Sequence, residues 1–121
     1  MNDLAKDIMA ALSEYGQGVT QDVKEAVAAV AKDCAQDIRA NARAAFNGNE
    51  YAKDWRVKKV EETPQGLTAV VYSPRHYMLA HLLEHGHAKR GGGRVEGRPH
   101  IGPAEQKATK ALENKVKEIV K

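Results

Sequence analysis

Cysteine, aromatic residues and long apolar runs are all scarce in this sequence. The single cysteine, Cys34, excludes a disulfide within the chain and is compatible with a reducing compartment. Cys34 lies in an alanine-rich helical pattern, so we expect it to be a small core residue and not a nucleophile. No apolar run approaches the roughly 20 residues of a membrane span, and the acidic N-terminus lacks the pattern of a signal peptide. We therefore expect no membrane partner.

The shortage of aromatic residues predicts a thin hydrophobic core. Aromatic residues make up 5% of the 121 residues, and alanine supplies much of the apolar content. Because small side chains bury little area each, we expect the protein to gain stability from neighbouring subunits. The net charge of +3 does not by itself indicate a nucleic-acid partner.

The apolar spacing predicts one α+β domain over residues 1–121, in which a long N-terminal helix and a C-terminal helix pack on a small antiparallel β-sheet. The N-terminal part is expected to contain a short helix over residues 3–15 and a long helix from Thr20 to about Phe46. The expected segments are a helical arm (1–48), a β-hairpin (50–73), a short helix (74–86), a long Gly/Arg-rich loop (87–102) and a C-terminal helix (103–121).

Proline, glycine and serine residues predict where these elements begin and end. A turn over residues 63–66 joins the two strands, and Val60 interrupts the alternation of the first strand, which indicates a β-bulge. Ser73 is expected to cap the short helix, with Pro74 at its first position. Gly86 is expected to end that helix with a left-handed backbone.

All five histidines lie between residues 73 and 103, and HLLEH at residues 81–85 matches the HxxEH pattern of inverted zinc peptidases. His81 and His85 share a helix face and could bind one Zn²⁺, with Glu84 polarising a water molecule. A structural metal could also use His87 or His100. The missing third ligand, the two leucines inside the motif and the short chain argue against catalysis. We favour histidines that hydrogen-bond backbone and loop groups at a surface.

The predicted loop concentrates positive charge, with Lys89, Arg90, Arg94 and Arg98 against only Glu96. It lacks the GxxxxGK[ST] pattern of a phosphate-binding loop. A flexible basic loop over residues 87–98 that contacts a nucleic-acid backbone and a merely solvated loop remain about equally plausible. No GxSxG motif or paired nucleophile and base is present, so we predict no enzyme and no cofactor.

Four segments resemble a family of tailed-bacteriophage morphogenesis proteins, the small head–tail joining or tail-completion proteins of long-tailed phages. These are YAKDWRVK at 51–58, LLEHGH at 82–87, GGRV at 92–95 and PHIGPA at 99–104. Members often lack a histidine at the position of His85, which weakens the zinc hypothesis. The resemblance implies a non-enzymatic virion protein at the neck that acts as a ring oligomer and completes the tail or joins it to the DNA-filled capsid.

The resemblance also implies the partners. These would be portal or adaptor proteins on the head side and tail-tube or tail-terminator proteins on the tail side, with channel DNA as a further contact. The protein would be made in the host cytoplasm and reside in the virion. We expect the loop to be poorly ordered in an isolated subunit and to contact a neighbouring subunit or DNA. The predicted contact residues are His87, Lys89, Arg90, Arg94, Arg98 and His100.

Overall fold

The computed structural model describes residues 20–46, 49–64 and 66–119. A long helix at each end of this part and a small antiparallel sheet between them confirm the predicted α+β class. The helix expected over residues 3–15 lies outside the described residues. The described elements are α2 (Thr20–Ala45), α3 (Asn49–Lys53), β1 (Arg56–Thr63), β2 (Gly66–Tyr72), α4 (Tyr77–His85), β3 (Gly86–Ala88), β4 (Arg94–Glu96) and α5 (Gly102–Ile119).

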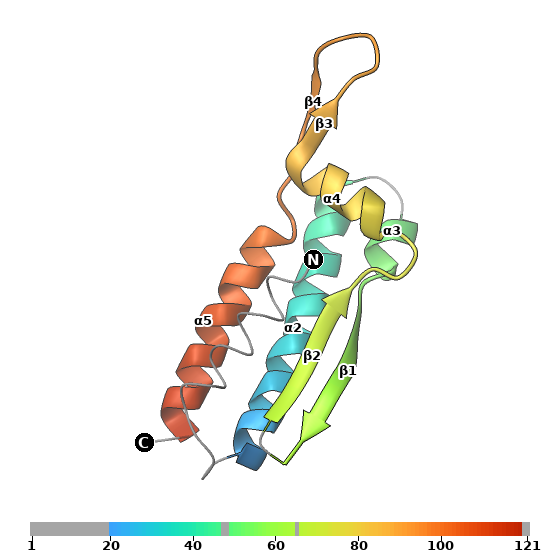
Figure 1. Ribbon diagram of the computed structural model, residues 1–121. Coiled ribbons are helices and arrows are strands. Elements are labelled where there is room, and N and C mark those ends of the chain that lie inside the picture. Colours follow the sequence, from blue (N-terminus) through green and yellow to red (C-terminus); the bar gives the residue numbers. More distant parts are fainter. Residues whose placement is uncertain (1–19, 47–48, 65, 120–121) are drawn as a thin grey trace.

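Helix α2 is the central element and packs against both β2 and α5 (Figure 1). It begins at Thr20 and ends at Ala45, close to the predicted bounds. Its buried face is built mostly of alanine and valine, which lets the neighbouring elements approach closely. The buried side chains of α2 are Val23, Ala26, Val27, Val30, Ala31, Cys34, Ala35, Ile38 and Ala42.

Strands β1 and β2 form the predicted antiparallel hairpin. Their register shifts between Lys59 and Glu61, so Val60 forms the predicted bulge. Alternate residues of β2 are buried and face the core beside α2. These buried residues are Leu67, Ala69 and Val71.

The first strand begins later than we predicted. Residues 50–53, expected to lie in the hairpin segment, belong to helix α3, and β1 starts at Arg56. Tyr51 lies in α3 and Trp55 lies two residues beyond its end, and their ring centroids lie 6.2 Å apart. Both side chains are buried, so this segment contributes two aromatic rings to the core.

The predicted start of the short helix was wrong. Helix α4 begins at Tyr77, and residues 74–76 form a turn. Ser73 does not cap this helix because its hydroxyl donates a hydrogen bond to Asp54 Oδ2 at 2.7 Å. Helix α4 lies near the end of α2 that is adjacent to α3 (Figure 1).

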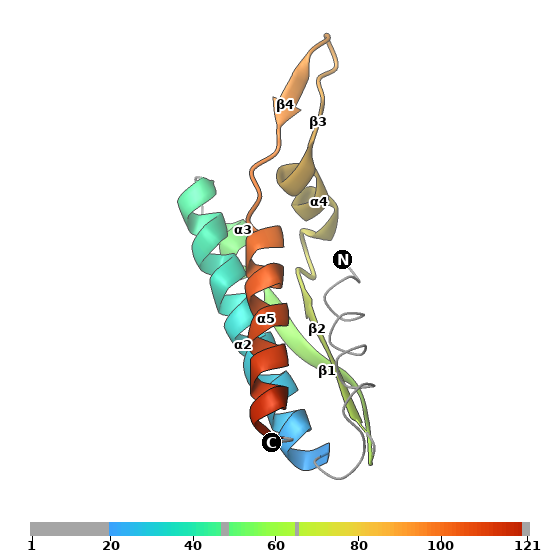
Figure 2. The same ribbon diagram turned by 90° about the vertical axis from the view of Figure 1, so that its left-hand side faces the viewer.

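Residues 86–97 form an arm that projects from the body of the molecule (Figures 1 and 2). We predicted a loop here, whereas β3 and β4 pair as a short antiparallel hairpin. Its turn is closed by hydrogen bonds from Lys89 N to Gly93 O (3.0 Å) and from Gly92 N to Lys89 O (3.2 Å). The sequence did not predict this hairpin because each strand has only three residues and three consecutive glycines lie between them, so no alternation of apolar and polar residues is visible.

Helix α5 runs alongside α2 and completes the core (Figure 2). Its buried residues Ala104, Ala108, Leu112 and Val116 recur every four positions and form one face of the helix. Among the described helices, none combines the length and apolar character needed to cross a membrane.

Candidate functional site

The carboxylate of Glu84 joins α4 to the start of α5. Oε1 accepts hydrogen bonds from the backbone N–H groups of His100 and Ile101, both at 2.8 Å, and Oε2 accepts one from Gly102 at 2.9 Å. A helix N-terminus leaves such N–H groups unpaired, so Glu84 acts as a cap supplied by another helix. Burial acts to raise the pKa of Glu84, but these three N–H donors and His100 hold it below its usual value.

His100 is fully buried beneath this cap. Its Nε2 lies 2.6 Å from the hydroxyl of Tyr51, and its Nδ1 lies 2.8 Å from Arg98 O and 3.1 Å from Glu84 Oε1. Two acceptors at Nδ1 favour the tautomer that carries hydrogen there, with Nε2 accepting from Tyr51. We predicted His100 as a contact residue in an exposed loop. That assignment is corrected, because the chain turns inward at His100 to begin α5.

Tyr51 lies at the centre of an aromatic group at the same end of the molecule. Burial, the largest cause, and the negative charges of Glu84 and Asp54 raise its pKa to about 12. The phenol therefore stays protonated, and its O–H donates a hydrogen bond to Nε2 of the His100 ring. The ring centroids of Phe46, Trp55, His76 and His100 lie 6.1, 6.2, 5.9 and 5.5 Å from that of Tyr51.

Asp54 is the second buried carboxylate. Its Oδ2 accepts hydrogen bonds from Ser73 Oγ (2.7 Å), the backbone N–H of Arg75 (2.8 Å) and His76 Nδ1 (3.0 Å). Burial acts to raise the pKa of Asp54, but these hydrogen bonds and the charge of His76 lower it to about 2. Asp54 thereby ties the end of α3 to the turn before α4. We call Tyr51, Asp54, Ser73, His76, Glu84 and His100 together the polar junction.

The residues of the HxxEH pattern do not assemble a zinc site. His81 and His85 are exposed on α4, with ring centroids 4.8 Å apart. Glu84, which would have to polarise a water molecule, is occupied by three N–H groups of the chain. Within the residues that the structure describes, no group of three or more His, Cys, Asp or Glu side chains could hold a metal ion. The described residues therefore provide neither the general base nor the third metal ligand that the hydrolase hypothesis requires.

The four cations of residues 87–98 divide into two pairs. Lys89 and Arg90 are exposed at the tip. Arg94 Nη2 donates to His85 O at 2.7 Å, and the Arg98 guanidinium donates to Ala45 O and lies 5.9 Å from the ring centroid of Phe46. Lys89 and Arg90 are thus the charges that a partner could meet most freely.

A groove of about 300 Å³ lies at the base of the arm, on the side of α4. His87 and Val95 face each other across β3 and β4, and His87 Nδ1 is buried without a hydrogen-bond partner among the described residues. Four large apolar side chains of α4 and β4 are 38–68% exposed, and two of them, Leu82 and Val95, line the groove. They are Met78, Leu79, Leu82 and Val95. The groove is lined by Phe46, Leu82, Leu83, His87, Val95, Glu96 and Arg98.

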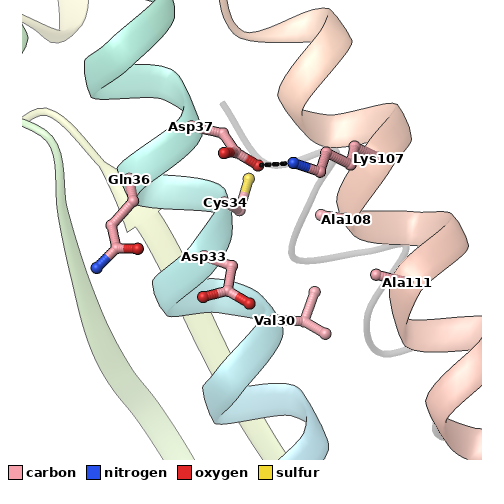
Figure 3. A pocket seen from close by; sticks show the side chains of 8 residues that line it. All are labelled: Val30, Asp33, Cys34, Gln36, Asp37, Lys107, Ala108 and Ala111. Carbon is pink, nitrogen blue, oxygen red and sulfur yellow. Dashed lines mark ion pairs between the residues drawn. The ribbon is translucent and has the colours of Figure 1, made fainter.

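A smaller hollow of about 150 Å³ lies between α2 and α5, where Cys34 points toward α5 (Figure 3). Lys107 Nζ lies 3.2 Å from Asp37 Oδ2 across it. Cys34 is 1% exposed, and burial, with the charges of Asp37 and Glu105, raises the pKa of its thiol to about 12. A thiol with such a high pKa is a poor nucleophile, and its burial confirms the predicted core position.

Sequence reasoning did not identify Asp54 or Ser73 as partners. The two residues lie 19 positions apart in different predicted elements, and no sequence spacing connects them. One signal in the sequence could have suggested this contact. Asp54 stands beside Trp55 in a segment expected to form core, and a carboxylate buried there needs hydrogen-bond donors nearby.

These features define a small α+β protein whose ionisable groups hold its elements together and whose arm and apolar surface remain free for contacts. Residues 6–86 match the model of the HK97-gp10-like family, described as "Bacteriophage HK97-gp10, putative tail-component". Because the match covers more than half of the chain, the protein belongs to this phage tail-component family. No curated protein and no solved structure matches the chain.

The family assignment confirms the predicted resemblance to phage morphogenesis proteins. The matched region ends at Gly86, so most of the arm and all of α5 lie beyond it. The resemblance noted in the sequence relied mainly on residues 82–104 and therefore complements the family match.

Proposed function

We propose that this protein is a non-enzymatic virion protein at the head–tail interface, where it completes the tail or joins it to the DNA-filled capsid as a ring oligomer. Membership of the phage tail-component family carries this proposal. The geometry supports it, because Glu84 and Asp54 serve the fold while the arm and α4 present contact surface. Portal or adaptor proteins would be the head-side partners, and tail-tube or tail-terminator proteins the tail-side partners.

The direct test is a phage or prophage that carries this gene with an early stop codon. After induction, electron microscopy should find DNA-filled heads and tails that have not joined, and purified wild-type protein added to the lysate should restore infectious particles. Joined, infectious particles in the absence of the protein would overturn the proposal.

A second candidate function is a nucleic-acid contact by residues 87–98, which the exposed Lys89 and Arg90 at the arm tip favour. Phosphate contacts should give DNA affinity that falls steeply with salt. Replacing both residues by serine should reduce the slope of log affinity against log salt by about 2, since each phosphate contact contributes roughly 0.9. Lys110→Ser, on the exposed face of α5, is the control. DNA affinity that does not respond to salt would remove this function.

A further inference from the structure

Two exposed histidines lie side by side on the last turn of α4. His81 and His85 are four residues apart, so their side chains lie on the same face of the helix. Their ring centroids are 4.8 Å apart, with an angle of 55° between the ring planes. The rings of His76 and His100 are held by hydrogen bonds in the polar junction, whereas each of these two exposed rings packs against the other.

The spacing of the two rings fits a shared metal ion. Imidazole nitrogens bind zinc at about 2.0–2.1 Å, which puts each ring centroid roughly 3.2 Å from the ion. Bond angles of about 90–109° at the metal would then place the two centroids about 4.5–5.2 Å apart. The observed 4.8 Å lies inside this range, so the backbone of α4 already holds the two rings at the separation that one ion requires.

The donor atoms of the pair determine which ions would bind. Neutral imidazoles suit zinc, nickel and copper, whereas magnesium and calcium require oxygen ligands. The neighbouring carboxylate, Glu84, already accepts three hydrogen bonds from N–H groups at the start of α5. The guanidinium of Arg94 donates to His85 O at 2.7 Å, and its positive charge opposes the binding of a cation. Two neutral ligands beside a positive charge predict micromolar and not nanomolar affinity.

A site of this kind differs from a catalytic zinc centre. Catalysis requires a third protein ligand and a free Glu84, and a two-histidine site requires neither. We propose that His81 and His85 together bind one divalent transition-metal ion of the zinc, nickel and copper group. Water completes the coordination of the ion in the free subunit.

The position of the site gives the ion a structural role. His85 is the last residue of α4, and β3 begins at the next residue, Gly86. An ion that joins residues four apart can remain bound only while the turn between them is helical. Metal binding therefore stabilises the turn of α4 from which the arm starts.

Full-length protein purified without a histidine tag tests the site. Isothermal titration calorimetry with zinc chloride should find one ion per chain at micromolar affinity, nickel chloride should also bind, and magnesium chloride should not. Zinc at ten times the dissociation constant should raise the thermal midpoint by roughly 5 °C. Zinc should also slow hydrogen exchange at residues 82–85. A wild-type protein that does not bind zinc would overturn the proposal.

Substitutions distinguish this site from general binding by a histidine-rich chain. His81→Gln and His85→Gln should each weaken zinc binding at least tenfold, and His81→Cys should retain it because a thiolate is also a zinc ligand. Both positions are exposed, so melts without metal should match wild type. His87→Gln is the matched control and should leave the affinity unchanged, because no third ligand joins the pair within the part of the chain that the structure describes. Unchanged affinity in His81→Gln, or an equal loss in His87→Gln, would contradict the two-histidine site.

Discussion

Glu84 is a helix residue whose main contacts are with another helix. Replacing it by glutamine removes the charge that the N-terminus of α5 favours and leaves one oxygen to serve three N–H donors. We expect Glu84→Gln to lower the free energy of unfolding by about 2 kcal/mol in urea denaturation. Glu113→Gln, on the exposed side of α5, is the matched control and should change stability little. Equal effects of the two substitutions would contradict the capping role.

Asp54 should make the protein sensitive to acid. Its pKa falls from 3.8 to about 2 on folding, and a lowered folded-state pKa contributes stability above the unfolded value. That stability is lost as the pH falls from about 4 to about 2. Urea denaturation across this range should therefore give a flatter pH dependence for Asp54→Asn than for wild type. Asp33→Asn, at an exposed position of α2, should retain the wild-type slope.

Gly86 cannot carry a side chain without strain. Its φ is +80°, and a Cβ there would lie 2.4 Å from Val95 O and 2.7 Å from Gly97 N. The positive φ agrees with the predicted left-handed position, although its ψ of 176° is extended. We expect Gly86→Ala to destabilise by about 2 kcal/mol in thermal or urea unfolding. Gly91→Ala, where a Cβ meets nothing within 4 Å, should be close to neutral.

At the scale of elements, periodic patterns predicted well and isolated side-chain contacts did not. The long helices α2 and α5 and the bulge at Val60 were predicted correctly, because each follows from a regular apolar spacing or from its interruption. The predicted start of α4 was wrong because the Ser73 hydroxyl donates to the carboxylate of the distant Asp54 and does not cap the helix. The cap from Glu84 was equally invisible, since its partners lie 16–18 residues away.

The arm should be the least protected element of an isolated subunit. Residues 88–96 are all exposed, and a two-stranded hairpin without a core is marginally stable in water. Hydrogen exchange at low protein concentration should therefore find these amides exchanging much faster than those around Ile38 in α2. Assembly should slow the exchange of the arm. Protection of the arm equal to that of α2 in the monomer would contradict the expected disorder.

At the scale of the whole molecule, Cys34 reports on the packing of α2 against α5. The thiol is 1% exposed, lies 3.8 Å from Ala104 O and has a pKa of about 12. We expect a thiol reagent to leave it unmodified in the native protein and to modify it fully in denaturant, with a rate that follows global unfolding. Rapid labelling under native conditions would show that the two helices separate locally.

Backbone contacts hold the two sides of the arm close together at its base. A Cβ at Gly97 would lie 2.4 Å from Glu84 O, and Arg98 N donates to Leu83 O at 2.8 Å. The packing of the rest of the molecule therefore does not depend on the length of the arm, since residues added between Gly91 and Gly93 would leave these base contacts unchanged. Loop closure costs only about 0.6 kcal/mol for each doubling of length. The length of the arm, and so the distance that it reaches from the body, can therefore change through the tip alone.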